Sequence, residues 1–407
     1  MSTLMVNIKR EYFINAGVFL TALFVYFILN MFNWNILKAC NDVFFNADTN
    51  EVYQQIDNIY LNKDMMRHFV SYLALFSLNK LFIIFGLSKL SLFSFIGAIN
   101  VSLSYVFFRK HEVTIALSIM LSILYLFSFG QLTVGIFPET YGVTMSLVWV
   151  YLLMYYSVNL KNEQMLGYEV RRIVFAAVIG SNHLPLAAVY FIGRSKYLKD
   201  RPFYFIFGCF IVGTMSFAPY LAAILARGGE EVFGFAQRYA DLGHFIDLNS
   251  WKATLINIFG ISVVSPFPRL INIYYFPYPY AMGPINIFGT SIWLLLLISS
   301  AFRTILSYRD SILIDKNLSV IFAIISIFMF YLYLSPKNSA LYGVTLLPFF
   351  FILLADSLKK SRSKLYLVGI LILIPIVAFT GIETLLSPIV SECKSWGVRP
   401  GLGYSGA

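Results

Sequence analysis

The sequence predicts an all-α polytopic membrane protein with about eleven membrane-embedded helical segments. Hydrophobic residues make up 59% of its 407 residues and charged residues only 12%, whereas about one quarter of a soluble domain is charged. The apolar residues are grouped into runs of about 17 to 24, close to the ~20 residues that a helix needs to cross the ~30 Å hydrocarbon layer. Because lipid offers the backbone no hydrogen-bond partner, such runs must be helical.

The chain has no internal repeat and no low-complexity linker, so we expect one membrane-embedded domain over residues 1–407. The first run follows Lys9 and Arg10 and is too long for a typical signal peptide, which predicts a retained signal anchor with its N-terminus in the cytoplasm. The apolar runs lie at about 13–34, 69–86, 90–108, 113–130, 140–158, 173–193, 203–226, 285–302, 317–335, 340–357 and 365–386.

Basic residues decide which runs cross the membrane, because cytoplasmic loops collect Lys and Arg. One arrangement places every strongly basic loop inside. In it, 69–86 is a juxtamembrane helix on the outer face, and 173–193 is a broken pair of half-helices that enters and leaves on one side. The outer loops are then 35–67, which is acidic, and 227–284. The inner loops are 109–112, 159–172, 194–202, 303–316 and 358–364.

Several functions are disfavoured by composition. The net charge of +10 is explained by this topology, and no basic stripe interleaved with aromatics lies outside a run, so nucleic acid is not an expected partner. The three cysteines form no CxxC pair, which argues against zinc. Cys209 lies inside an apolar run and is expected to pack there, while Cys40 and Cys393 are either two separate thiols or an outer-side disulfide. No nucleotide-binding glycine motif occurs in a suitable context.

Two acidic residues on the predicted outer side are candidate catalytic groups. Asp48 follows the first helix and could act as a general base toward an acceptor hydroxyl, although an Asp before Thr also suits a helix N-cap. Glu139 lies at the start of an apolar helix, where the helix dipole alone would favour a carboxylate by ~0.3–1 kcal/mol.

Candidate phosphate-binding residues lie on the same predicted side. Arg67 and His68 stand where the acidic loop returns to the membrane, a position suited either to a lipid phosphate or to an ordinary interfacial anchor. Asn182 and His183 lie between Gly180 and Pro185 in the middle of an apolar run. This pattern predicts a helix break, and irregular backbone at depth is tolerated where it lines a cavity. The fifth candidate is Lys337, in a tight outer turn that leads to Tyr342.

In their order, these features resemble the GT-C superfamily of membrane glycosyltransferases, which includes protein O-mannosyltransferases and the bacterial aminoarabinose transferase of lipid A. The matching stretches cover residues 10–195 and, more loosely, 330–358, and the GT-C-like module would span about 10–230. They are Asp48, Arg67-His68-Phe69, Phe107-Phe108-Arg109-Lys110, Pro138-Glu139-Thr140-Tyr141, Ser181-Asn182-His183, Ala340-Leu341-Tyr342 and Leu346-Leu347-Pro348.

The resemblance implies an activity, a donor and roles for the residues. The donor would be a sugar linked to polyprenyl phosphate, and the acceptor a glycan, lipid or protein on the non-cytoplasmic face. Asp48 would activate the acceptor and Glu139 would help to place it, while Arg67, His68, His183, Asn182, Lys337 and Tyr342 would contact the donor phosphate. The chain departs from the family at Phe69, where Pro is expected, and at Thr49, where a second acid is expected. A divalent metal is compatible with the family but is not indicated by these residues.

Two other functions fit the same topology. A polymerase that joins polyprenyl-linked repeat units would also have many helices and long outer loops, but it would be expected to carry more arginines than 227–284 holds. A flippase or transporter of lipid-linked sugar would be expected to have a second broken helix to match the one at 180–185. In each case, the high content of Phe, Tyr, Ile and Lys suggests a bacterial cytoplasmic membrane, with the active face outside.

Overall fold

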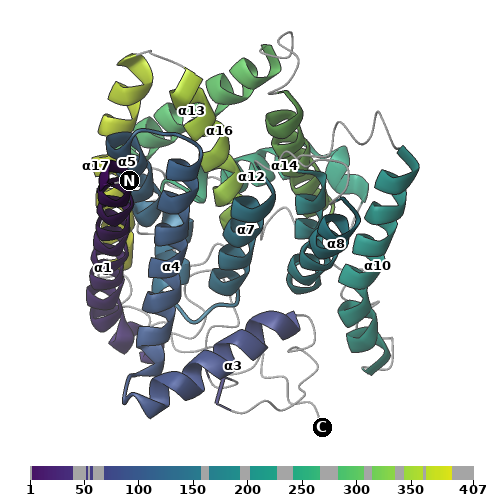
Figure 1. Cartoon of the computed structure of the whole chain (residues 1–407), viewed down its shortest axis with the longest axis horizontal. Helices are drawn as coiled ribbons and strands as arrows, with labels where there is room; N and C mark the ends of the chain where they lie inside the picture. Colours follow the sequence, from purple (N-terminus) through teal and green to yellow (C-terminus); the bar gives the residue numbers. More distant parts are fainter. Residues whose placement is uncertain are drawn as a thin grey trace.

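The computed structural model describes residues 2–39, 52–53, 56–57, 68–156, 165–192, 202–226, 242–265, 283–306, 314–334, 343–360 and 364–386. These residues form helices and no strands, so the all-helical prediction is confirmed for them. Figure 1 shows the helices arranged as a bundle, and most of their buried apolar residues form one large cluster. In chain order the elements are α1 (Ser2–Ala39), α3 (Phe69–Ile84), α4 (Lys89–Lys110), α5 (Ile115–Phe127), α6 (Phe129–Ile136), α7 (Tyr141–Tyr155), α8 (Met165–Asn182), the 3₁₀ helix η3 (Leu184–Phe191), α10 (Pro202–Ala226), η4 (Leu242–Phe245), α12 (Leu248–Leu255), the π-helical turn η5 (Ile256–Ile261), α13 (Pro284–Leu306), α14 (Ile314–Leu334), η8 (Val344–Leu346), α16 (Leu347–Lys360) and α17 (Lys364–Leu386).

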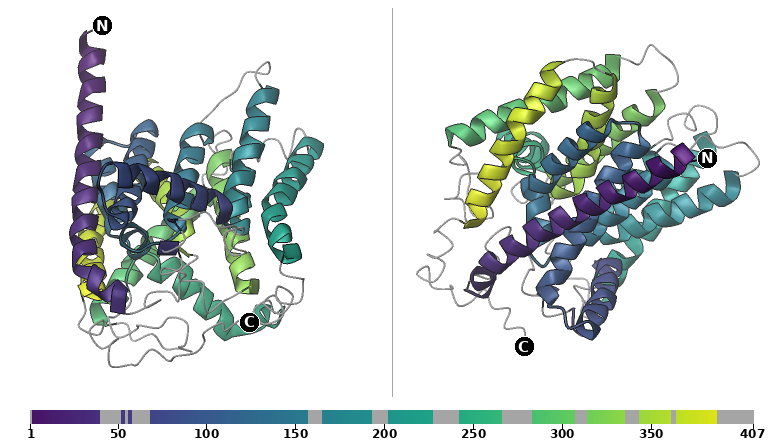
Figure 2. Two further views of the ribbon diagram at one scale, coloured as in Figure 1. Left: turned by 90° about the horizontal axis from the view of Figure 1, so that it is seen from below. Right: turned by 60° about the vertical axis from the view of Figure 1, so that its left-hand side comes forward.

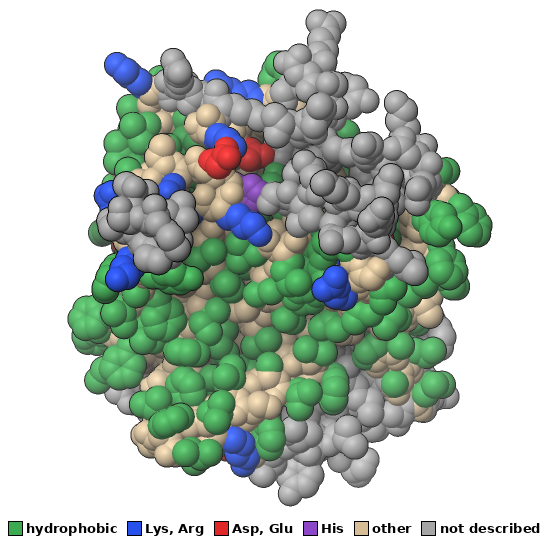
Figure 3. All heavy atoms as spheres, viewed as in Figure 1, with side chains coloured by type: hydrophobic (Ala, Val, Ile, Leu, Met, Phe, Trp, Pro, Cys, Tyr) green, Lys and Arg blue, Asp and Glu red, His purple; other side chains and the backbone are tan. Residues whose placement is uncertain are grey.

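Five helical stretches in the described chain are long and apolar enough to cross a membrane, which makes this a multi-pass membrane protein. They are Lys9–Phe32, Lys89–Lys110, Pro202–Ala222, Pro284–Leu306 and Lys364–Leu386. The bent pair α5–α6 is a sixth candidate. Eleven segments are therefore not reached by length and composition, because several apolar runs of the sequence form shorter or broken helices. Figure 3 shows a face covered mainly by hydrophobic side chains, with its acidic and most of its basic side chains gathered toward one end.

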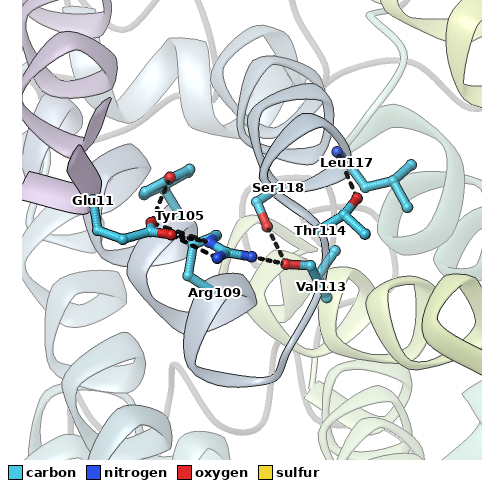
Figure 4. A network of polar contacts seen from close by, with 7 residues as sticks. All are labelled: Glu11, Tyr105, Arg109, Val113, Thr114, Leu117 and Ser118. Carbon is cyan, nitrogen blue, oxygen red and sulfur yellow. Dashed lines mark hydrogen bonds and ion pairs between the residues drawn. The ribbon is translucent and has the colours of Figure 1, made fainter. Parts of the chain in front are cut away.

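The antiparallel helices α1 and α4 run from one end of the bundle to the other and are bonded to each other near both ends. Toward one end, the Asn30 side chain donates to the Leu90 carbonyl oxygen at 3.0 Å. Toward the other, Glu11 receives a bidentate contact from Arg109, with the closest Nη2–Oε1 distance 2.6 Å, and a hydrogen bond from the Tyr105 hydroxyl at 3.0 Å (Figure 4). Helix α1 is the longest element, and its N-terminal part extends past its neighbours in Figure 2.

The end that carries Arg109 is called the basic end, because the described parts of the predicted inner loops meet there. Lys359 of α16 forms an ion pair with Glu112 at 2.6 Å, and this contact lowers the pKa of Glu112, which favours its carboxylate form. Asp356 of α16 accepts a hydrogen bond from Tyr156 at 3.0 Å. The arrangement agrees with the sequence-based grouping of 109–112, 159–172 and 358–364.

Helix α3 lies crosswise to α1 and α4 at the opposite end, which we call the α3 end (Figures 1 and 2). One face packs on a small apolar cluster that includes Ile96 of α4 and Val143 of α7. Its buried residues are Ser71, Tyr72, Leu75, Asn79 and Phe82. The outward face is also apolar, with Leu73, Leu81, Ile83, Ile84 and Phe85 exposed. A crosswise helix with an apolar outer face is suited to the boundary between lipid and water.

Residues 52–53 and 56–57 of the acidic segment 35–67 pack against the α3 end. Val52 and Ile56 belong to the apolar cluster under α3. Asp57 forms an ion pair with Lys89 at the start of α4, and its carboxylate accepts a hydrogen bond from Asn79 of α3 at 3.2 Å. The segment therefore ties α3 to α4 by both apolar and charged contacts.

The run predicted at 113–130 is interrupted at Ser128, where α5 and α6 meet at 66°. The break is stabilised from outside the pair. The backbone N–H groups of Phe129 and Gly130 donate to the carbonyl oxygens of Val263 and Ser262, at 3.0 and 2.8 Å. Every residue of α6 is buried, so this irregular backbone is surrounded by protein, as a membrane interior requires.

Helix α6 approaches α1 and α4 closely because two glycines face each other. A Cβ placed on Gly97 would lie 2.6 Å from the Gly135 Cα and 2.8 Å from the Tyr26 ring. Tyr26 is fully buried and fills the space beside both glycines.

We expect Gly97→Ala to destabilise the bundle by about 1–3 kcal/mol, the usual cost of overpacking a core. Gly17→Ala is the matched control, because a Cβ at Gly17 of α1 meets no atom within 4 Å. Thermal unfolding of the purified proteins in detergent measures the stability of both variants. Equal melting temperatures for the two variants would contradict this account of the packing.

Candidate functional site

The helix break predicted at 180–185 is present and forms the tip of a hairpin. Helix α8 ends at Asn182, His183 has extended backbone angles (φ −144°, ψ 100°), and η3 begins at Leu184 with Pro185 in its first turn. The chain then returns beside α8, since the Arg172 guanidinium donates to the Tyr190 carbonyl oxygen at 3.4 Å. The pair α8–η3 therefore starts and finishes on one side, as expected for 173–193.

Asn182 connects the hairpin tip to two other helices. Its backbone carbonyl oxygen accepts hydrogen bonds from His68 Nδ1 at 2.6 Å and from the Tyr220 hydroxyl of α10 at 3.2 Å. Because a carbonyl oxygen can only accept, His68 carries its proton on Nδ1. The Asn182 side-chain oxygen accepts from the backbone N–H of Ser71 in the first turn of α3, at 3.0 Å. This bond satisfies a group that a helix N-terminus leaves unpaired.

Three aromatic rings meet at the tip. The His183 ring is stacked on Tyr141 of α7, with centroids 4.2 Å apart and an interplanar angle of 21°. The ring of His68 lies 4.6 Å from that of His183 and 6.5 Å from that of Tyr141. Residues about 115 positions apart in the chain thus form one cluster, which we call the His68–His183 cluster.

Two helix N-termini face this cluster. Helix α3 begins at Phe69 and α7 begins at Tyr141, and the hydroxyls of Ser71 and Thr144 in their first turns lie 3.3 Å apart. The N-terminus of a helix carries roughly +0.5 elementary charge and presents backbone N–H groups to anions. Their convergence favours a negatively charged ligand or side chain at this place.

Glu139 supplies one such negative group. It stands two residues before α7 and is buried, with 6% of its surface exposed. A buried carboxylate at a helix N-terminus is stabilised by the helix dipole, and it can still accept a proton from a bound hydroxyl.

The Nε2 atom of His183 has no hydrogen-bond partner among the described residues. The side chain is only 4% exposed, so bulk water does not compensate for the missing bond. Leaving a buried polar atom unpaired costs about 1–3 kcal/mol. A ligand group that bonds to this nitrogen would recover that free energy.

The structure unites half of the predicted site residues. His68, Asn182 and His183 are in direct contact, and Glu139 lies two residues before Tyr141 of the same cluster. Asp48, Arg67, Lys337 and Tyr342 lie outside the described residues, as do Cys40 and Cys393. Cys209 lies in α10, half-buried against the core, as expected.

Several contributors were not among the predicted site residues. Tyr141 and Thr144 follow Glu139 on α7, and their helical spacing on one face was the available signal. Ser71 contributes through its backbone and hydroxyl, which a sequence pattern does not reveal. Tyr220 comes from a helix that has no sequence signal linking it to Asn182.

Within the described chain, no set of three or more His, Cys, Asp or Glu side chains is close enough to hold a metal ion. No protein-family model, curated protein or solved structure matches the chain. The geometry of the His68–His183 cluster is therefore the feature that indicates a function.

We expect Asn182→Ala to lower the stability of the protein by about 1–2 kcal/mol. The substitution keeps the carbonyl contact with His68 but removes the acceptor of the Ser71 N–H, which is comparable to deleting a helix cap. Ser181→Ala is the matched control, because its hydroxyl donates only to Val178 of the same helix. Thermal unfolding in detergent should separate the two variants, and a loss of the same size in Ser181→Ala would argue against a capping role.

Proposed function

We propose that this chain is a membrane glycosyltransferase that moves a sugar from a polyprenyl-phosphate-linked donor to an acceptor at the α3 end of the bundle. The observation that carries the proposal is the buried Nε2 of His183, which has no hydrogen-bond partner in the described part of the chain and lies beside two converging helix N-termini. Such a site suits a phosphate oxygen. The buried carboxylate of Glu139 close by in the sequence suits the acceptor hydroxyl.

The position of the cluster supports a substrate that is shared between lipid and water. The outer face of α3 is apolar and exposed, so the N-terminus of α3 would lie at the membrane boundary, where the phosphate of a long lipid is found. Arg109 and Lys359, from two of the predicted inner loops, lie at the opposite end. By the positive-inside rule the α3 end is then the non-cytoplasmic face.

The chemistry would be a direct displacement at the anomeric carbon. The acceptor oxygen forms a bond to that carbon while the bond from the carbon to the phosphate oxygen breaks, and polyprenyl phosphate leaves. The acceptor proton passes to a carboxylate, Glu139 or Asp48. His183, His68 and the N-terminus of α3 would stabilise the charge that develops on the departing phosphate. One displacement inverts the configuration at the anomeric carbon.

This proposal keeps Asp48 and Arg67 in the roles that the family resemblance gives them. Arg67 directly precedes His68 in the sequence, and Lys337 and Tyr342 remain candidates for the donor phosphate. The GT-C fold and a bacterial cytoplasmic membrane belong to the same proposal. The polymerase is the alternative, and it would be identified by an acceptor that is itself a polyprenyl-linked repeat unit.

We expect His183→Gln to lower kcat/KM for the donor by about 100-fold, since deleting one group that stabilises a developing anion typically costs that much. Purified protein in proteoliposomes would be supplied with radiolabelled mannose or glucose linked to polyprenyl phosphate, together with membrane glycolipid as acceptor. Release of polyprenyl phosphate and labelled product are measured together.

His111→Gln is the matched control for that experiment. His111 also packs among aromatic rings, 4.2 Å from the ring of Phe107 and 4.7 Å from that of Tyr156, but at the basic end. Its turnover should stay within about twofold of wild type. Wild-type turnover in both His183→Gln and Glu139→Gln would eliminate the proposed site.

A second candidate function is favoured by the bend between α5 and α6. Together with the hairpin α8–η3 it gives the bundle two broken elements, a feature of transporters that hold substrate between helix halves. The same vesicles discriminate the two functions. Movement of labelled lipid-linked sugar across the bilayer with no covalent product would replace the transferase with a flippase.

A further inference from the structure

Arg172 of α8 lies far from the His68–His183 cluster and has an unusual environment. Its side chain is 3% exposed, although it carries a full positive charge. The Nε atom donates to the Tyr151 hydroxyl at 3.0 Å, and Nη2 makes a long hydrogen bond of 3.4 Å to the Tyr190 carbonyl oxygen. The distance to His183 along α8 is roughly 16 Å, from eleven residues at 1.5 Å each.

Tyrosine rings surround the guanidinium on several sides. Its central carbon lies 5.8 Å from the ring centroids of Tyr151 and Tyr155 and 6.0 Å from that of Tyr190. Each such contact stabilises a cation by about 0.5–2 kcal/mol at short range, and these distances are at the far limit of the interaction. The rings therefore cover the charge more than they neutralise it.

No carboxylate within the described chain pairs with Arg172, and Nη1 forms no hydrogen bond there. A guanidinium has five N–H donors and does not lose its proton in proteins. A buried charge without a counter-ion is strongly unfavourable. By contrast, Arg109 at the same end of the bundle is paired bidentately with Glu11.

The sequence on both sides of the hairpin is rich in positive charge. Arg171 is exposed at the neighbouring position, and Lys161, Arg194, Lys196, Lys199 and Arg201 flank the hairpin in the sequence. Basic clusters of this kind attract the phosphate groups of anionic lipids. A phosphate group would supply the counter-ion that Arg172 lacks within the described part of the chain.

We propose that Arg172 binds a phosphate oxyanion beside the rings of Tyr151, Tyr155 and Tyr190, as a second site distinct from the cluster at the α3 end. Nη1 and the free N–H of Nη2 match two phosphate oxygens, because guanidinium groups bind phosphate in a bidentate manner. The tyrosine rings exclude water and so strengthen the contact. The phosphate belongs either to an anionic lipid of the adjacent leaflet or to free phosphate, and the experiment separates these sources.

The test uses the full-length protein in nanodiscs of phosphatidylcholine, with three additions compared at constant ionic strength. The additions are phosphatidylglycerol, inorganic phosphate and chloride. We expect phosphatidylglycerol or phosphate, but not chloride, to raise the melting temperature of the wild type, since a ligand that binds only the folded state stabilises it. A shift with phosphatidylglycerol alone identifies a lipid, and a shift with phosphate alone identifies the free ion.

Two variants test whether stabilisation by the anion depends on Arg172. In Arg172→Met the apparent affinity for the stabilising anion should fall at least about tenfold, whereas Arg171→Met, which removes an exposed charge one residue away, should keep it. If Arg172→Met does not fold, Arg172→Lys serves instead, since it retains the charge without the fork and should bind the anion more weakly. The proposal is overturned if no anion stabilises the wild type, or if the variants at 172 respond like the wild type.

Discussion

The hydrogen bonds of Asn182 hold the α3 end of the molecule together. One residue bonds to α3 through its side chain, and to His68 and α10 through its backbone carbonyl. These bonds are available only because α8 stops at this residue, which frees a carbonyl that a continuing helix would use internally. The same break places the His183 ring in contact with the rings of Tyr141 and His68. The end of α8 at Asn182 therefore explains both the contacts that build the His68–His183 cluster and the polar groups found in it.

Irregular backbone inside a membrane protein must be satisfied by the protein itself, and both breaks in this chain follow that rule. At Ser128 the free N–H groups at the start of α6 are bonded by the carbonyl oxygens of Ser262 and Val263, which directly follow η5. At Asn182 the free carbonyl is bonded by the side chains of His68 and Tyr220. The first break is therefore held by backbone groups, whereas the second brings two histidine rings into contact in the buried part of the α3 end.

Much of the architecture follows from sequence periodicity, and the remainder depends on contacts between distant segments. The run 90–108 became α4, Lys89–Lys110, and the break predicted between Gly180 and Pro185 is found at Asn182 and His183. The bend at Ser128 was missed because its run contains no Gly or Pro before Gly130, and the interaction that holds it comes from residues 262–263. His68 and His183 were selected for their chemistry, but their contact depends on the crosswise direction of α3. The general-base role given to Asp48 stays a prediction.

Helix α10 is joined to the bundle mainly through the hairpin, since its substantial contacts are with α8 and η3. Small residues permit this close fit, because Gly180 faces Ser216 and Gly208 faces the Tyr190 hydroxyl. Most of its apolar surface, including Phe203, Phe207 and Phe210, is exposed. Outside a bilayer, lateral pressure no longer presses α10 against its neighbours, and detachment of this helix would withdraw Tyr220 from Asn182. The choice of detergent will consequently decide whether purified material retains an intact α3 end.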